Sequence, residues 1–454
     1  MKLVRQSFTP VRPLAVFLAT ALFLSVSAAP GRAAAAPTGP APETLDLRSA
    51  IAFALENNFA IRQAKERIRQ QEGVVLEVRA RQIPNVGAAG TYQLNEKEIS
   101  SYIPAADRSW QISVTATQVL FAGGGVRSAV RGSNLAREAA VLDLQATIND
   151  ALLQVRTAFY GVLLAREKIK VQESNLELLQ SQLRTATDRY RAGTVSSFEQ
   201  LRAEVAVANA RAPLITARND YRLAIETLRQ VAGYTSASRD PQSRPPEFVG
   251  TLDFTPVNFD LASAFGAAHA NRPDLKRLEK LVDAGQENVK TARAGYLPTV
   301  SAFGGWALRR GSTNAFRDSP EGFLGGVQSQ WNIFDGRATA GRVIQARSAV
   351  EQARLGLTET QLAVDVAVRR AYSQWQEATE LAETSQKVVE QATEAVRLAN
   401  ARYAAGTSTQ LDVLQAQVEL TTARTNQIQA FYSYNVAVAA LRTAMGLADE
   451  FVTR

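Results

Sequence analysis

Four short segments of the chain alternate between apolar and polar side chains, which is the pattern of a β-strand with one apolar face. In the segment at about 110–121, Trp110, Ile112 and Val114 alternate with glutamine, serine and threonine. The same period of two recurs at about 85–95, 299–308 and 323–334. The sequence therefore predicts four strands, arranged as two pairs that lie far apart in the chain.

A period of seven replaces the period of two after each pair of strands. Apolar residues recur at every seventh position from Ile148 to Tyr190 and from Val368 to Tyr403, and no proline interrupts 126–190 or 339–403. These heptads predict two long coiled-coil helices, each a rod of roughly 100 Å at ~1.5 Å per residue. Returning helices are expected at about 197–232 and 410–445, and Pro213 is expected to kink the first. A further helical pattern of about forty residues precedes each strand pair and ends at a proline.

These patterns occur twice because the chain is internally duplicated. The stretches RYRAGT from Arg189 and RYAAGT from Arg402 lie 213 residues apart, and the same offset aligns QVLFAGG with WNIFDGR. Upstream the offset becomes 214, where Pro84 aligns with Pro298. We expect a first repeat at 37–234, a linker at 235–256, a second repeat at 257–447 and a tail at 448–454.

The first 36 residues have the layout of a secretory signal peptide, with a basic start, an apolar run and a stretch of small residues. Cleavage is expected near 29–36, and the apolar run is short for the alternative, a transmembrane anchor. This leader holds four of the 51 basic residues and none of the 43 acidic ones, so the net charge of +8 falls to about +4 in the exported chain. Such a modest charge does not indicate a nucleic-acid partner.

The chain has no cysteine, and His269 is its one histidine. Disulfides and the lipid anchor of a bacterial lipoprotein are therefore not expected, and neither is a histidine-based catalytic triad or metal site. We expect His269 to lie at the surface or at a helix end. These absences argue against an enzyme, a metal site or a cofactor, although a site built from carboxylates alone stays open.

Four strands are too few to close a membrane barrel, and open sheet edges do not face lipid. If these strands span a membrane, several chains must pool them, and two chains supply eight strands while three supply twelve. A signal peptide together with membrane strands indicates the outer membrane of a Gram-negative bacterium. The long helices would then continue the pooled barrel as a helical tube in the periplasm.

The order of helix, strand pair, long helix, Gly-Thr turn and returning helix resembles the TolC family of outer-membrane efflux proteins. The stretches NRPDLKRLEKLVDAGQENVKTARAGYLPTVSAFG, NIFDGR and RYAAGTSTQLDVLQAQ are similar to that family's recognisable segments. The resemblance implies an α+β membrane protein, in which a homotrimer shares a twelve-stranded barrel above an α-helical coiled-coil barrel. It also implies a passive duct that docks to a periplasmic adaptor and to an inner-membrane transporter of the RND, ABC or MFS type.

Glycine at the Gly-Thr breaks permits the left-handed conformation that ends a helix, and threonine supports a reversal of the chain. Gly193, Thr194, Gly406 and Thr407 are therefore predicted to form two helical hairpin turns. A plain turn is the simpler interpretation. The resemblance adds that these turns form a periplasmic tip where the adaptor docks.

The resemblance also implies a gate at this tip, and three chains would arrange each gate residue as a ring. Asp412 and Glu199 match acidic positions, although Asp412 also suits the start of a helix, where the dipole favours an acid. Tyr403 and Tyr190 match a gate tyrosine but also continue the heptads. The chain departs from the family at Gln415, where a second acid is usual, and at Ser408, where an arginine is usual.

Four aromatic residues lie on the predicted apolar strand faces, namely Tyr92, Trp110, Trp306 and Trp331. We interpret them as membrane-interface aromatics that contact outer-membrane lipid, with packing against a neighbouring element as the alternative. The function expected is an exit duct for efflux or type I secretion. The rival is an exported coiled-coil scaffold of the cell envelope, which leaves the four strands unexplained.

Overall fold

The computed structural model describes residues 44–94, 108–234, 246–309 and 320–451. The chain divides into two units, Met1–Ala41 and Pro42–Arg454, and every described residue belongs to the second. The predicted leader at 1–36 lies outside the described residues, as do residues 235–245 of the predicted linker.

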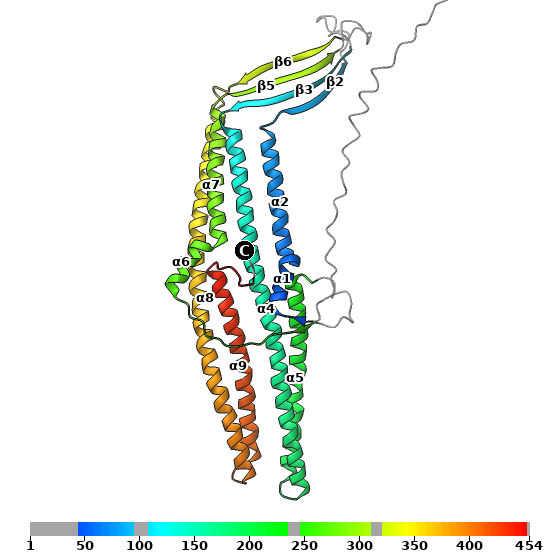
Figure 1. Ribbon diagram of the computed structural model, residues 1–454, viewed down its shortest axis with the longest axis vertical. Helices are drawn as coiled ribbons and strands as arrows, with labels where there is room; N and C mark the ends of the chain where they lie inside the picture. Colours follow the sequence, from blue (N-terminus) through cyan, green and yellow to red (C-terminus); the bar gives the residue numbers. More distant parts are fainter. Residues whose placement is uncertain (1–43, 95–107, 235–245, 310–319, 452–454) are drawn as a thin grey trace, which may run out of the picture. The chain divides into compact units, whose positions relative to one another are not determined.

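Four antiparallel strands form one sheet in the order β2-β3-β5-β6 (Figure 1). They are β2 (Asn85–Leu94), β3 (Arg108–Ala122), β5 (Thr299–Arg309) and β6 (Glu321–Gln330). The central pair, β3 and β5, joins the two repeats, and β2 and β6 are left as the edges of the sheet. The four strands that the sequence predicts are therefore confirmed.

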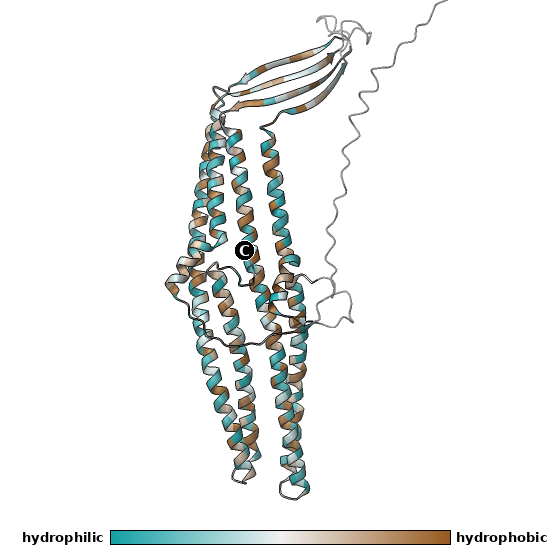
Figure 2. Cartoon of the chain, in the orientation of Figure 1, coloured by the Kyte–Doolittle hydropathy of each residue, from teal (hydrophilic) through white to brown (hydrophobic). Residues whose placement is uncertain are grey.

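The strand register gathers the large apolar side chains on one face of the sheet. Tyr92 lies opposite Trp110, and Trp306 lies opposite both Val114 and Phe323. Residues directly opposite one another in a ladder share a face. This face is uncovered in the chain, because Tyr92 is 63% exposed and Phe323 is 92% exposed. Figure 2 shows hydrophobic and hydrophilic residues alternating along the strands.

β6 ends earlier than the sequence predicts, at Gln330 rather than near 334. The cause is its partner, because β5 begins at Thr299, which already pairs with Gln330. No ladder is left for the residues that follow, so Trp331 lies just outside the strand instead of on its face.

The predicted alternation in β3 also breaks, at Leu120. A bulge between Val119 and Phe121 leaves Leu120 without a partner in the register. A bulge inserts one extra residue and shifts the side chains beyond it to the other face. As a result Phe121 lies opposite Val300 and joins the apolar face.

The helices come in equivalent pairs, as expected of a duplicated chain. They are α1 (Leu47–Asn57) with α6 (Leu261–Asn271), α2 (Phe59–Ala80) with α7 (Pro273–Arg293), α4 (Gly125–Arg191) with α8 (Ala338–Ala404), and α5 (Ser197–Ala232) with α9 (Gln410–Ala444). α4 and α8 each have 67 residues. Pro213 lies inside α5, which continues through it. No helix in the described part of the chain combines the length and apolar character needed to cross a membrane.

The helical pattern before each strand pair is broken into two helices, which the sequence analysis missed. In the first repeat Asn58 separates α1 from α2, and its side-chain oxygen accepts hydrogen bonds from the amides of Ala60 and Ile61. In the second repeat Pro273 is the first residue of α7, where a missing amide proton costs nothing. Both breaks follow from local capping chemistry rather than from hydrophobic period.

The long helices form two hairpins, here called the first hairpin (α4 and α5) and the second hairpin (α8 and α9) (Figure 1). α2 packs on α4, and α7 packs on both α4 and α8. The heptad residues Val155, Val162 and Val368 are fully buried, in two apolar clusters halfway along the hairpins. The short strands β1 (Thr44–Leu45) and β4 (Glu247–Phe248) pair in parallel beside one of them, and a single turn, η2 (Ala294–Tyr296), links α7 to β5.

Candidate functional site at the helical hairpin tips

Each long helix ends in the same hydrogen-bonded reversal. Gly193 and Gly406 adopt φ angles of 71° and 73°, the left-handed region that favours glycine. In both turns the glycine amide donates to a tyrosine carbonyl, and the following threonine amide donates to an arginine carbonyl at 2.9 Å. This pair of bonds is the Schellman motif. The hydroxyls of Thr194 and Thr407 donate to the same arginine carbonyls.

The returning helix of the second hairpin begins with a capping box. The amide and the hydroxyl of Thr409 both donate to a carboxylate oxygen of Asp412, at 2.8 and 2.9 Å. The Asp412 amide in turn donates to the Thr409 hydroxyl at 3.4 Å. These bonds from Thr409 hold the pKa of Asp412 below its ordinary value. Within one chain, Asp412 therefore acts as a helix-start acid and stays charged.

Glu199 stands at the equivalent position of the first hairpin but makes a different contact. Ser196, which precedes α5, forms no side-chain cap. The Glu199 carboxylate instead accepts a hydrogen bond, at 3.5 Å, from the hydroxyl of Tyr403 in the second hairpin. The Arg189 guanidinium lies over the Tyr403 ring, 4.5 Å from its centre. One tyrosine therefore touches two charged groups of the other hairpin.

Only part of the predicted gate comes together in the chain. Glu199 and Tyr403 meet, whereas Tyr190 is 45% exposed. Gln415 donates to Glu419, four residues along its own helix, at 3.3 Å. The buried hydroxyl of Ser408 has no hydrogen-bond partner among the described residues. Sequence reasoning missed Arg189, because an arginine in the last turn of a helix is common for capping reasons alone.

A polar layer lies behind the tip, where α9 packs on α4. The Thr421 hydroxyl donates across this contact to the Asn175 side chain at 3.1 Å. One turn away, Gln417 is 1% exposed, and neither polar atom of its side chain has a hydrogen-bond partner in the described part of the chain. A buried amide without partners is destabilising. The two hairpins are thus held less firmly here than at their apolar clusters.

We expect Gln417→Leu to raise the free energy of unfolding by about 1–3 kcal/mol, because leucine removes a buried amide that lacks a partner. The midpoint of urea-induced loss of helical circular dichroism measures this. Gln415→Leu is the matched control, since Gln415 is exposed on the same helix and its replacement should change stability by less than about 0.5 kcal/mol. A loss of stability in Gln417→Leu would show that the amide makes stabilising bonds.

The four predicted membrane-interface aromatics lie at two levels of the sheet. Tyr92 and Trp110 are opposite one another, near the last residue of β2 and the first residue of β3. Trp306 lies near the corresponding end of β5. Trp331 lies at the other end of the sheet, beyond β6, where its indole nitrogen donates to the Tyr296 carbonyl at 3.1 Å. Two aromatic levels are typical of membrane strands.

His269 lies in the last turn of α6, a helix end as expected, and its Nε2 is 2.7 Å from a carboxylate oxygen of Asp365 on α8. Among the residues that the structure describes, no group of three or more histidine, aspartate or glutamate side chains is arranged to hold a metal ion.

Comparison with known proteins shows where this architecture recurs. A family model described as outer membrane efflux protein matches residues 50–234 and 265–447. Protein CyaE of Bordetella pertussis is 26% identical, over 92% of this chain and 88% of that protein. Outer membrane efflux protein BepC of Brucella suis is 25% identical, over 97% of this chain and 92% of the relative. The CmeC outer membrane channel of Campylobacter jejuni shares the fold, with a TM-score of 0.77 at 15% identity over 88% of this chain and 85% of CmeC.

Proposed function

Because the chain belongs to the outer membrane efflux protein family, we propose that three copies form the exit duct of a tripartite efflux or type I secretion system. The protein is an outer-membrane channel of Gram-negative bacteria and not an enzyme. The duct is passive, and an inner-membrane transporter of the RND, ABC or MFS type supplies the energy. Efflux is the activity that the name of the Brucella relative states.

One observation carries this proposal, namely a four-stranded sheet that exposes an apolar face and has two open edges. Its strands of 10 to 15 residues are long enough to cross a bilayer. Open edges are not tolerated in lipid, so chains must pool their strands, and three copies supply twelve. β3 ends at Ala122 and α4 begins at Gly125, so the barrel passes almost directly into the helical tube.

The hairpin turns are the proposed docking surface for the periplasmic adaptor. Gly193, Thr194, Gly406 and Thr407 are all exposed, and their Schellman motifs hold two turns of the same shape. Three chains would present six such turns around one axis. A repeated rigid surface of this kind suits an adaptor that binds several equivalent positions.

The contact of Glu199 and Arg189 with Tyr403 is the proposed gate, because it ties the two hairpins together at their ends. Opening the tip separates the hairpins and breaks this contact. The unsatisfied Gln417 behind it lowers the cost of that separation. Asp412 takes part through its charge, as one of three acids in a ring around the axis.

We expect Glu199→Ala combined with Asp412→Ala to raise single-channel conductance in a planar bilayer and to weaken block by cations. The change removes the acceptor of the Tyr403 hydroxyl and the proposed ring of acids. Glu419→Ala is the control, because Glu419 is an exposed acid on the same helix as Asp412. Conductance and cation block equal to those of the unaltered protein would place the gate elsewhere.

Detergent extraction from outer-membrane fractions tests the proposal against the rival envelope scaffold. A channel is recovered as a trimer that conducts ions in a bilayer. A scaffold would be recovered without detergent and would not conduct, and that result would refute the exit duct. The exposed apolar sheet face favours the channel, since a soluble scaffold gains nothing from it.

A further inference from the structure

Basic side chains gather where the sheet meets the helices. The four segments that meet there, 73–84, 123–134, 285–298 and 331–344, contain eight basic and only three acidic residues. At the hairpin tips, the segments 182–206 and 393–418 are nearly balanced, with six basic and five acidic residues. The positive charge of the helices is therefore concentrated at the end next to the sheet.

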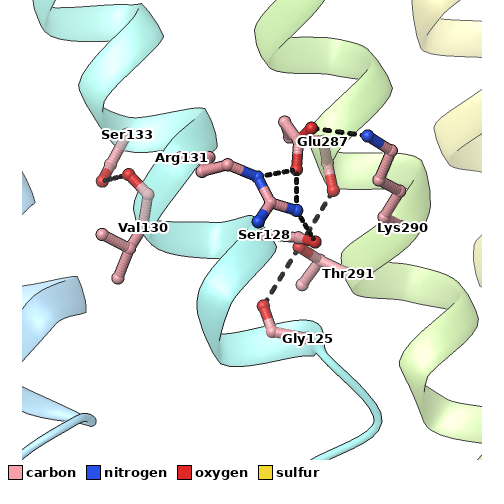
Figure 3. A network of polar contacts seen from close by, with 8 residues as sticks. All are labelled: Gly125, Ser128, Val130, Arg131, Ser133, Glu287, Lys290 and Thr291. Atoms are coloured by element: carbon pink, nitrogen blue, oxygen red, sulfur yellow. Dashed lines mark hydrogen bonds and ion pairs between the residues drawn. The ribbon is translucent and has the colours of Figure 1, made fainter.

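The acids at this junction neutralise only some of the cations (Figure 3). The Glu287 carboxylate, 11% exposed, accepts a hydrogen bond from Arg131 Nε at 2.9 Å and another from Lys290 Nζ at 2.6 Å. Arg81 and Arg127 are exposed, and neither side chain has an ion pair or a hydrogen bond within the described part of the chain. Their charges are thus available to a ligand.

Arg81 and Arg127 line one pocket of about 380 Å³, between the end of α2, the end of β3 and the start of α4. The third wall of this pocket is apolar and consists of Val119, Leu120 and Phe121, all three of them exposed. The bulge leaves Leu120 without a strand partner and places Phe121 on the apolar face of the sheet. The pocket therefore combines two guanidinium groups with a wall that continues the apolar face.

The second repeat has the same backbone at this place but different side chains. The chain enters α4 and α8 alike, through two successive residues with φ between 58° and 79°. The offset of 214 takes Arg81 to Gly295, and the offset of 213 takes Arg127 to Ala340. An added Cβ at Gly295 would lie 2.9 Å from the hydroxyl oxygen of Thr339, so no arginine fits there. The two arginines are thus particular to the first repeat.

The second repeat also supplies an anion of its own at this junction. The Asp335 carboxylate accepts a hydrogen bond from the Thr339 amide at 2.7 Å and lies 3.7 Å from the Arg342 guanidinium. The equivalent of Asp335 in the first repeat is Ala122, which lines the pocket. The first repeat therefore has a methyl group in place of the carboxylate, beside two arginines that lack a counter-charge.

We propose that this pocket binds an anionic phospholipid of the periplasmic leaflet, with Arg81 and Arg127 on its phosphate and an acyl chain along Val119, Leu120 and Phe121. Guanidinium groups match phosphate oxygens in charge and geometry, and basic pockets at a membrane surface bind anionic headgroups. The apolar wall favours a lipid over a small polar anion. The inference rests on the proposed function, because it needs the sheet in the membrane and the helices in the periplasm.

Native mass measurement of the detergent-extracted protein, titrated with dimyristoyl phosphatidylglycerol, tests the two arginines. Arg81→Gln combined with Arg127→Gln is expected to bind this lipid about 30-fold more weakly, since each basic residue near a headgroup contributes about fivefold. Arg69→Gln combined with Arg137→Gln is the matched control. These two arginines are also exposed on α2 and α4 but do not line the pocket, so the control should keep its affinity.

Ala122→Asp tests the site with both arginines in place. This change gives the first repeat the carboxylate that the second repeat has at Asp335, so it is expected to displace the lipid and to weaken binding as strongly as the loss of both arginines. Ala122→Asn is the control, because it adds a side chain of similar size without the charge and should retain most of the binding. Undiminished lipid binding in Ala122→Asp and in the double arginine variant would overturn the site.

Two further probes identify the ligand class. Dimyristoyl phosphatidylcholine, with the same acyl chains but no net charge, should bind more weakly than phosphatidylglycerol, and equal binding would overturn recognition of an anionic lipid. Inorganic phosphate that binds as tightly as the lipid would show that the apolar wall takes no part, and would also overturn the proposal. Single-channel conductance separates this inference from the duct. Variants that lose the lipid should still conduct, whereas an unaltered protein that does not conduct would refute the duct itself.

Discussion

Replacing Asp449 with alanine is expected to lower the free energy of unfolding by about 3–5 kcal/mol, because the change leaves a buried guanidinium without its counter-charge. Both carboxylate oxygens of Asp449 accept hydrogen bonds from Arg156 of α4 at 2.8 Å. The two side chains are only 14% and 10% exposed. Phe451 completes the contact, since the guanidinium groups of Arg48 and Arg156 both lie 5.1 Å from the centre of its ring.

This contact fastens the end of the second repeat to the first. Arg156 belongs to α4 and Arg48 to α1, whereas Asp449 and Phe451 follow α9. The residues 448–451 that the sequence suggested as a tail are therefore part of the packed structure. Loss of the Arg156–Asp449 ion pair is expected to weaken the packing of α4 against α9 halfway along the hairpins, far from the tip.

The pH dependence of the effect follows from the pKa of Asp449. Burial raises that pKa, but hydrogen bonds from Arg156 and from the Phe451 amide outweigh burial, so the pKa lies below its ordinary value. A carboxylate with a depressed folded-state pKa contributes stability above its unfolded pKa of about 3.9, and loses it as the pH falls through the folded-state value. The penalty of Asp449→Ala should thus be constant from about pH 7 to pH 5 and shrink below about pH 4.

Urea titration of helical circular dichroism measures the penalty, and the neighbouring acid is the matched control. Glu450 pairs with Arg442 but is 55% exposed, so Glu450→Ala should cost less than about 1 kcal/mol. Arg156→Met combined with Asp449→Leu should recover much of the stability, because it removes both buried charges. Equal losses of unfolding free energy in Asp449→Ala and Glu450→Ala would contradict a stabilising role for the buried Arg156–Asp449 ion pair.

The architecture could be predicted from the sequence because it follows from two hydrophobic periods, of two and of seven residues, and from the spacing between the two repeats. Alternation predicts the strands and their apolar face, heptads predict the long helices, and the offset of 213 places Gly193 and Gly406 in equivalent turns. The sequence failed to predict those element boundaries that are set by contacts with another segment of the chain. β6 ends at Gln330 because β5 starts opposite it, and α1 ends at Asn57 because the side chain of Asn58 caps the next helix.

The site was less predictable, because its contacts join residues that are distant in sequence. Glu199 and Tyr403 were each expected at the tip, but no pattern states that they touch. The role of Asp412 in a capping box follows from Thr409 three residues earlier, a local signal that was available. The ion pair of Asp449 with Arg156 could not be predicted, since a single acidic residue after a helix is part of no repeating sequence pattern.

Replacing Phe159 with alanine is expected to lower the free energy of unfolding by about 3–5 kcal/mol, through lost burial and the cavity left behind. Phe159 is 1% exposed on α4, at the centre of an apolar cluster to which α1 and α5 both contribute. Its ring meets the Phe248 ring edge to face, with centres 6.3 Å apart. The cluster thus joins α1, α5 and β4 to the long helix.

Two substitutions separate burial from the general effect of losing an aromatic ring. Phe198→Ala should change stability by less than about 0.5 kcal/mol, because Phe198 is 62% exposed near the tip. Phe159→Leu should cost only about 1–2 kcal/mol, since leucine fills much of the space. Urea titration of helical circular dichroism measures all three variants. Similar costs for Phe159→Ala and Phe198→Ala would mean that the cluster around α4 does not form the stabilising core of the first repeat.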